Sequence, residues 1–439
     1  VSDASDVTIQ WYQNGQLINN ATAFTYQPTL AGTYYAELSR NGNTITSEVA
    51  EVKFLLDGSA VKSGYGFFAP LSQNPVKVIK TGPQGAAYVG ALSQGVGSGT
   101  LSRILPDATA DPAWAPVISG TIYDLIVEPD GAAVVVGDLN IQGPAPVVTQ
   151  IARYQSDGTR DLDFQTNVGT GCGVSGTIRV ISRYPNGELL VGGNFSEWNG
   201  SPLSPSSSLV KLDASGVRIP GFNSDRNGVA VSAVALPDGG ALVIYTNTVY
   251  QLAASGVTVA SKFLNNGLKE ISSAGPGKWL VVSSQNFSFN GTSGTVARLD
   301  SDLNIEQVFP ITKAETAAGQ ANGKVIVGGT FISNSRRKIA RFLADGSVDS
   351  SFSTANGLRT FSEIDGNLVT SLAERPDGSF WVGGTFPGYG PANQVSHANF
   401  VLINGDPVAI QILSEPAGRF INTGESVVLT ASASSDLPL

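Results

Sequence analysis

The residues that most often perform chemistry in proteins are scarce in this chain. Its 439 residues include one histidine, His397, and one cysteine, Cys172. A Ser-His-Asp arrangement would have to use His397 as its base, but this residue directly precedes the apolar run 398–403, where a position at a strand edge is expected. Cys172 has no basic neighbour that could lower the pKa of its thiol, so we expect it to be unreactive. The same counts leave almost no room for a zinc site built on cysteine and histidine.

Two motifs resemble binding loops but lack the context that such loops need. Residues 171–176 read Gly-Cys-Gly-Val-Ser-Gly, whereas a dinucleotide-binding glycine loop must be followed by a helix and here a strand pattern follows. The acidic groups at 107–111 and 157–163 lack the spacing of a calcium loop. We interpret both groups as turn residues, with a weak Ca²⁺ site as the alternative, and expect no cofactor.

Carboxylates and tryptophans leave one candidate contact. The 35 Asp and Glu residues fall mainly in turns, and no pair stands out as the acid and base of a glycosidase. Trp198 lies in a predicted loop and is the candidate for stacking on a sugar, whereas the other four tryptophans are expected in cores. Without a catalytic motif, we expect that the protein is not an enzyme.

Composition narrows the class of partner. Charged residues make up 14% of the chain, and the net charge is −9. The densest basic group is Arg336-Arg337-Lys338, so nucleic acid is not an expected partner. No apolar run approaches 18 residues, which predicts no membrane insertion. Low charge with an acidic balance favours a secreted or cell-surface protein.

A repeat organises the middle of the chain. Its first part is an apolar alternating run, a turn such as Pro-Asp-Gly, a second apolar run, then Gly-Gly-x-Phe; clear copies lie at 185–195, 322–331 and 376–386. Weaker copies bring the total to seven hairpins spaced roughly 40–56 residues apart, a spacing typical of propeller blades. Asn-Gly and Asp-Gly supply the positive φ of tight turns, and paired glycines indicate close backbone approach or a bulge.

A second part follows each hairpin. It reads Ala-Arg between apolar residues, then a turn and Asp-x-x-Phe, as in 151–164 and 339–352. Two hairpins make a four-stranded sheet that cannot bury both faces alone, whereas seven sheets around an axis can. We expect residues 58–68 to supply the outer strand that the last blade lacks, which would close the ring.

These repeats resemble the bacterial delta-sixty repeat family of β-propellers. The resemblance covers about residues 57–403 and is most specific in the second, third, sixth and seventh blades. It implies a propeller architecture and an exported or surface location rather than a particular chemistry.

The two ends of the chain resemble parts of one immunoglobulin-like domain. Near the N-terminus, Trp11 and Tyr34 stand where strands C and F carry their core tryptophan and tyrosine corner, and Ala36 replaces the second cysteine. Near the C-terminus, residues 407–439 resemble strands A and B, with strand A around 410–412 and strand B over 424–431. The alternating residues Val427, Leu429 and Ala431 would face the core there, with Ala431 in place of the first cysteine.

The short segment before the C-terminal strands disfavours completion of this domain within one chain. The link 404–409 spans at most about 21 Å, whereas strand A begins and strand G ends at opposite poles of a sandwich. We therefore expect the C-terminal strands of one subunit to complete the N-terminal domain of the next. Three interpretations stay open: separate subunits that polymerise, one repeat of a longer chain, or a boundary placed within the domain.

The sequence thus predicts an all-β protein of three parts. Residues 1–55 form an immunoglobulin-like domain without its first two strands, 56–405 a seven-bladed β-propeller, and 406–439 the two missing strands. The predicted function is that of an extracellular structural protein that assembles head to tail into a filament, its partner being itself. The alternative is a carbohydrate-binding or adhesive module of a larger surface protein, with glycans as partners.

Overall fold

The computed structural model describes most of the chain in two compact units, Val1–Leu56 and Asp57–Leu439. The structure describes residues 8–23, 26, 32–40, 43–47, 49–52, 75–91, 101–141, 150–173, 175–203, 208–320, 322–333, 336–350, 352, 368–386, 399–403, 411–414 and 432–434.

The first unit contains one antiparallel sheet. Its strands are β1 (Thr8–Gln13), β2 (Gln16–Leu17), β3 (Gly32–Arg40), β4 (Asn43–Thr46) and β5 (Ala50–Val52). They follow the order β2-β1-β3-β4, and β5 also pairs with β3. Asn14 and Gly15 turn between β1 and β2 with φ of 50° and 77°, the positive values that a two-residue hairpin turn requires.

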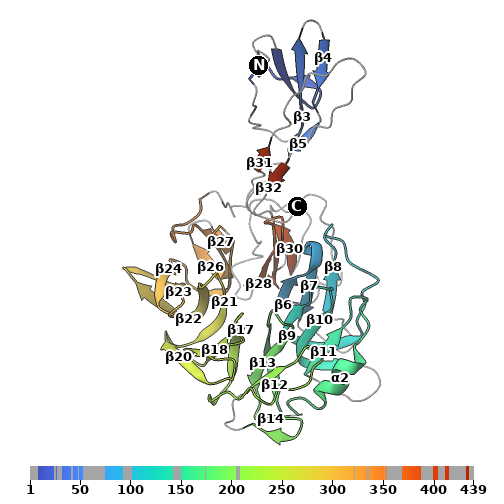
Figure 1. The fold of residues 1–439 in the computed structure, drawn as a ribbon. Helices are drawn as coiled ribbons and strands as arrows, with labels where there is room; N and C mark the ends of the chain where they lie inside the picture. The colour runs from blue at the N-terminus through green and yellow to red at the C-terminus, as the bar shows by residue number, and fades with distance from the viewer. Residues whose placement is uncertain are drawn as a thin grey trace. The chain divides into compact units, whose positions relative to one another are not determined.

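The second unit contains a succession of antiparallel sheets of three or four strands (Figure 1). Their strands are β6 (Val76–Thr81), β7 (Ala87–Ala91) and β8 (Leu101–Ile104); β9 (Ile118–Val127), β10 (Ala133–Ile141) and β11 (Ile151–Tyr154); β12 (Thr177–Arg183), β13 (Leu189–Asn194) and β16 (Leu209–Leu212); β17 (Ala230–Ala235), β18 (Ala241–Tyr245), β19 (Thr248–Leu252) and β20 (Thr258–Phe263); β21 (Leu268–Ser273), β22 (Trp279–Phe289), β23 (Thr292–Leu299) and β24 (Ile305–Phe309); β25 (Ala314–Gly319), β26 (Val325–Ser333) and β27 (Arg336–Phe342); and β28 (Leu368–Glu374), β29 (Phe380–Thr385) and β30 (Phe400–Ile403).

Smaller elements complete this unit. They are the 3₁₀ turn η2 (Pro83–Gly85), the helix α2 (Leu162–Val168), and the short strands β14 (Glu197–Trp198), β15 (Ser201–Pro202), β31 (Gln411–Ser414) and β32 (Ser432–Ser434). β31 and β32 pair antiparallel with each other.

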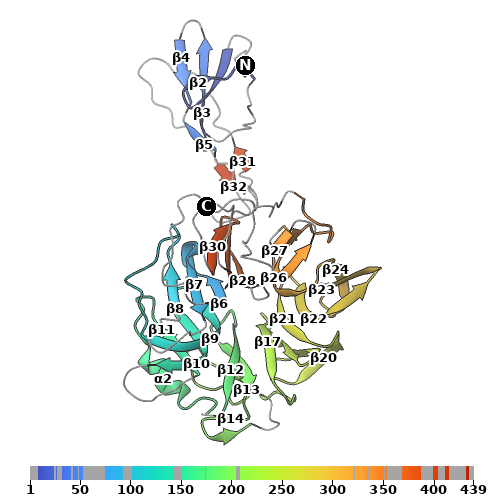
Figure 2. The same cartoon turned by 180° about the vertical axis from the view of Figure 1, so that it is seen from behind.

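The first strands of successive sheets form a closed circle (Figures 1 and 2). Each contacts the first strand of the next sheet, and β28 of the last sheet contacts β6 of the first. Several hydrogen bonds strengthen the closing contact. Among them, the Ile79 N–H donates to Ser371 Oγ at 2.8 Å, and Trp381 Nε1 donates to the Gly85 carbonyl at 3.1 Å. The unit is therefore all-β and propeller-like.

Each pair of glycines allows two close contacts, one with the adjoining sheet and one with the neighbouring strand of its own sheet, as the sequence predicts. A Cβ on Gly383 would lie 2.4 Å from Val76 Cγ1 of the adjoining sheet, and one on Gly384 would lie 2.0 Å from the Leu368 carbonyl across a bulge. Gly328 and Gly329 repeat this arrangement against Val369 and the Lys313 carbonyl. Any side chain at these positions would force the strands or sheets apart.

The Arg…Asp-x-x-Phe pattern forms one compact cluster in each of several sheets. Arg341 Nε donates to Asp349 Oδ2 at 2.9 Å, and its guanidinium lies 4.7 Å from the centre of the Phe352 ring. Equivalent clusters join Arg103, Asp111 and Trp114, and Arg153, Asp161 and Phe164. Each arginine thus neutralises its aspartate and covers an aromatic ring that fills the core.

Three outcomes qualify the sequence prediction. Helix α2 follows one of these aspartates where no helix is expected, because Asp161 Oδ1 also caps it by accepting a hydrogen bond from the Phe164 N–H at 2.9 Å. The outer strand predicted at 58–68 lies outside the described residues. Strand A, predicted around residues 410–412, overlaps β31, whereas the predicted strand B at 424–431 lies outside the described residues.

Candidate functional site

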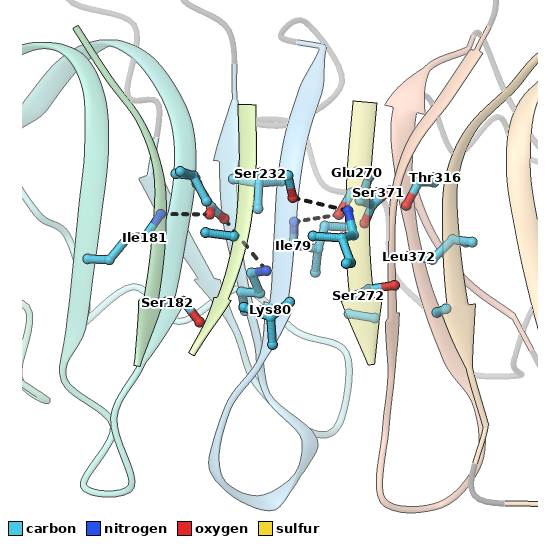
Figure 3. Close-up of a pocket in the computed structure, with 18 of the residues that line it drawn as sticks. Ile79, Lys80, Ile181, Ser182, Ser232, Glu270, Ser272, Thr316, Ser371 and Leu372 are labelled. Atoms are coloured by element: carbon cyan, nitrogen blue, oxygen red, sulfur yellow. Dashed lines mark hydrogen bonds and ion pairs between the residues drawn. The ribbon is translucent and has the colours of Figure 1, made fainter. Parts of the chain in front are cut away.

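A cavity of about 930 Å³ lies in the circle of first strands. Strands β6, β9, β12, β17, β21, β25 and β28 all contribute to its lining (Figure 3). Five basic and four acidic side chains lie among the lining residues: Lys77, Lys80, Arg179, Arg183 and Lys269, with Asp124, Glu270, Glu315 and Glu374. The cavity is therefore slightly basic in a chain whose net charge is −9.

A bulge at the same place in each first strand sets the order of these side chains. The pairing of each first strand with the second strand of its sheet skips one residue, and these bulge residues are Lys77, Tyr123, Arg179, Val231, Lys269, Glu315 and Thr370. The residues that directly follow them form a second ring, here called the collar: Val78, Asp124, Val180, Ser232, Glu270, Thr316 and Ser371. A bulge re-aims the side chains beside it, here around the central cavity.

Collar side chains bind the backbone of the neighbouring first strand. Ser232 Oγ accepts a hydrogen bond from the Ile271 N–H at 3.2 Å, and Asp124 Oδ2 accepts one from the Ile181 N–H at 3.1 Å. Ser371 does the same for Ile79. An inner strand has no further strand on its cavity side, so its N–H groups need such acceptors.

Glu270 is the collar residue with the most perturbed acidity. Burial raises the pKa of its carboxyl to about 7, and the repulsion of Asp124 adds to this increase. The attraction of Lys80 and the hydrogen bonds from Thr316 and the Ala317 N–H lower the pKa but do not offset the effect of burial. Glu270 therefore titrates near neutral pH, which is unusual for a carboxyl group. Figure 3 shows Glu270, Thr316 and Lys80 around the cavity.

The other three carboxylates of the cavity all have partners. Asp124 pairs with Lys80 at 3.6 Å, in addition to its backbone hydrogen bonds. Glu315 pairs with Lys269 at 2.7 Å, and Glu374 Oε1 accepts a hydrogen bond from Gln320 Nε2 at 3.1 Å. Lys77 and Arg179 differ, because neither makes an ion pair or a hydrogen bond within the described part of the chain.

The expected position of Trp198 in an exposed loop is wrong. It belongs to β14, which forms a small hairpin with β15, and its side chain is only 1% exposed. Its ring packs 5.9 Å from that of Phe195, in the core between sheets. Trp198 therefore offers no face for a sugar to stack on.

The predicted assembly residues of the first unit lie together on one sheet face. The β1–β3 register pairs Trp11 with Ala36 and Gln13 with Tyr34, and Tyr34 and Ala36 are buried. Tyr26 lies between the rings of Trp11 and Tyr34, 5.9 Å from each. The other predicted assembly residues, Val427, Leu429 and Ala431, and also His397, lie outside the described residues.

The remaining sequence candidates occupy structural roles. Cys172 is buried, and this burial raises the pKa of its thiol to about 11, which keeps it protonated at neutral pH. Asp107 and Asp157 accept hydrogen bonds from Thr109 and Thr159 within their turns. Among the described residues, no group of three or more His, Cys, Asp or Glu side chains is placed to hold a metal ion. No helix in the described part of the chain is long and apolar enough to cross a membrane.

Sequence reasoning anticipated a bulge at the paired glycines, but it missed the bulge residues that line the cavity and the collar. The available signal was spacing: each collar residue lies twelve positions before the residue that it faces in the second strand, as in Thr316 with Gly328 and Ser371 with Gly383. Glu270 and Asp124 occupy the same position in sheets that lack a full Gly-Gly pair. Alignment of the repeats on the hairpins would have revealed this polar column.

Comparison with known proteins supports the propeller-like fold. Residues 320–352 match a family described as a β-propeller domain of unknown function, DUF5122. Among curated proteins, no sequence matches the chain.

Solved structures also match large parts of the chain at low identity. The WD40 domain of Pan2 from Neurospora crassa is 10% identical, with a TM-score of 0.42, over 76% of this chain and 94% of that one. BamB from Moraxella catarrhalis is 12% identical, with a TM-score of 0.35, over 77% and 91% of the two chains. A protein of unknown function from Bacteroides caccae is 13% identical, with a TM-score of 0.35, over 58% and 87%.

Proposed function

We propose that this chain is an extracellular structural protein whose subunits assemble head to tail. In this proposal the second unit is a seven-bladed propeller of the delta-sixty repeat type, each sheet named above being one blade. The first unit is an immunoglobulin-like domain that lacks strands A and B. The C-terminal strands of one subunit supply them to the next.

The carrying observation is the face of the first unit's sheet. The register of β1 with β3 places Ile9, Trp11, Tyr34 and Ala36 on one face, and three of these four side chains are buried. The opposite face carries Tyr12, whose hydroxyl donates to Glu37 Oε2 at 2.8 Å. A sheet with one apolar and one polar face belongs to a two-layer domain. Because three of the four apolar side chains are already buried within one chain, the strands of the next subunit would extend the layer that covers this face.

The pairing of β31 with β32 supports the source of that layer. Two antiparallel strands are what strands A and B of such a domain would form, and an isolated pair of strands this short is at best marginally stable by itself. Alternating Val427, Leu429 and Ala431 would add apolar side chains worth about 1.5–3 kcal/mol for each large residue buried. A head-to-tail contact between identical subunits does not close on itself and generates a filament.

Light scattering of point variants tests the proposal. We expect the full chain to form long assemblies and Leu429→Asp to abolish them, because a carboxylate would enter the apolar face. Thr430→Asp is the matched control, since alternation places residue 430 on the outer face. The proposal fails if the full chain is monodisperse at the mass of one subunit, or if both variants assemble alike. A monodisperse full chain would favour an arrangement of successive copies within a longer chain, which would still give a fibre of alternating modules.

A further inference from the structure

We propose that the central cavity binds a small organic anion rich in acceptor oxygens, held by Lys77 and Arg179. The recognised group is a carboxylate or a phosphate ester. This inference does not depend on head-to-tail assembly.

The first observation is that both cations lack a partner among the residues that the structure describes. Lys77 and Arg179 are bulge residues of β6 and β12 and are exposed at the cavity, with no ion pair or hydrogen bond in the described residues. Several other basic side chains of this unit have a carboxylate partner, such as Lys211 with Glu188 and Arg153 with Asp161. In an acidic chain with this pattern, two unneutralised cations at one cavity favour a ligand that supplies the negative charge.

The second observation is an excess of hydrogen-bond donors around the cavity. Ser182, Ser232 and Ser371 each accept a hydrogen bond from a backbone N–H of the neighbouring first strand. A hydroxyl that accepts in this way still has its own proton to donate. These three serines therefore present O–H donors, which suit the oxygens of a carboxylate, phosphate or hydroxylated ligand.

The third observation concerns the carboxylates that could repel an anion. Asp124 and Glu315 are paired with Lys80 and Lys269, whereas the hydrogen bond from the neutral amide of Gln320 leaves the charge of Glu374 in place. The lining thus carries five cations against three charged carboxylates and Glu270. Burial keeps the carboxyl of Glu270 partly protonated near neutral pH, since it raises its pKa to about 7. The free charge that faces a ligand is therefore predominantly positive.

Size is compatible with a ligand of one sugar unit. The cavity of about 930 Å³ falls within the range of small-molecule sites, about 300–1,000 Å³. Polar hydroxyls and charged groups line it together with aliphatic side chains such as Ile79 and Leu372. A sugar acid or a sugar phosphate combines the anionic group with the further acceptor oxygens that the serines require.

The test compares three probes by isothermal titration calorimetry on the full chain. The probes are D-glucuronate, glucose 6-phosphate and glucose, which share a ring and differ in the anionic group. We expect at least one anion to bind at least about tenfold more tightly than glucose, and its affinity to fall as salt is added. Tighter glucuronate identifies a carboxylate site, and tighter glucose 6-phosphate identifies a phosphate site.

Variants assign the binding to the cavity. The double variant Lys77→Gln, Arg179→Gln should weaken the anion about tenfold or more, equivalent to 1.4 kcal/mol or more. Lys262→Gln is the control, because Lys262 is an exposed cation on β20 that does not line the cavity. Unchanged circular dichroism and thermal midpoint establish that the variants fold. The proposal is overturned if neither anion binds at about 10 mM, which is tenfold above a Kd of about 1 mM. It is also overturned if glucose binds as tightly as the anions, or if the double variant binds the anion like the control.

Discussion

The buried Arg341–Asp349 pair provides a quantitative test of how the repeat stabilises the sheets. The Arg341 side chain is fully buried and that of Asp349 is 4% exposed, with Nε and Oδ2 2.9 Å apart. Lys324 also reaches Asp349, at 3.2 Å. Asp349→Ala would leave a buried guanidinium without its counter-charge, a change that costs about 3–5 kcal/mol of unfolding free energy.

The chain contains its own control for this prediction. Arg103 and Asp111 have the same spacing, but the Arg103 side chain is 18% exposed, and it also donates to the Ser156 carbonyl at 2.7 Å. Asp111→Ala therefore leaves a cation that water and a carbonyl still solvate, and we expect a loss of about 1.5–3 kcal/mol. The double variant Arg341→Met, Asp349→Leu removes both buried charges and should lose less stability than Asp349→Ala alone.

Urea unfolding followed by tryptophan fluorescence measures these differences. The variants are compared through their midpoints, provided that the dependence on urea is unchanged. The reasoning is refuted if Asp349→Ala and Asp111→Ala cost the same within about 0.5 kcal/mol, or if the double variant is less stable than Asp349→Ala. Either result would mean that burial of the arginine does not set the cost.

Two further predictions concern the close approach of the sheets and the collar. Gly383→Ala places a Cβ 2.4 Å from Val76 Cγ1 and should lower the unfolding free energy measured in urea by about 1–3 kcal/mol. Gly221→Ala is the control, because a Cβ there would have no atom within 4 Å, and it should not destabilise the protein. Equal urea midpoints for the two variants would contradict the packing argument. Burial raises the folded pKa of Glu270 from its ordinary 4.5 to about 7, so its contribution to stability is complete below its unfolded pKa and is lost as pH rises through 7. Glu270→Gln should therefore gain stability relative to the native chain between about pH 5 and pH 8 in the same assay. Parallel pH profiles for the two proteins would show that the carboxyl is not perturbed.

The hairpins of the repeat were predictable because their signals are local. Turns such as 376–378 need a glycine at positive φ, and Gly378 has a φ of 75°. The paired glycines likewise report contacts that any side chain would prevent. The Arg and Asp of the second part could be recognised as a pattern, but their ion pair and their contact with the following aromatic ring became visible only in the structure.

Direction and packing were less accessible to sequence reasoning. Asn199 and Gly200 signal a turn, yet they do not reveal that the β14–β15 hairpin folds Trp198 into the core. Asp161 carries the same repeat signature as Asp349, and only the residues after it allow helix α2 to continue from its cap. The position of Trp198 and the presence of helix α2 depend on the space between neighbouring sheets.

The collar explains why ring closure and the chemistry of the cavity are coupled. Each first strand must have its cavity-side N–H groups satisfied, and serine or carboxylate oxygens on the preceding first strand do this in several sheets. Where Val78 offers no oxygen to the following strand β9, Asp124 accepts from the Leu125 N–H on its own strand as well as from Ile181 on the next. The backbone N–H groups of the first strands occupy the acceptor oxygens of the collar side chains, whereas the O–H donors of the collar serines stay available to a ligand in the cavity. Replacing a collar serine would therefore change both the junction between two sheets and the recognition of an anion, whereas replacing the bulge residue Lys77 should affect recognition alone.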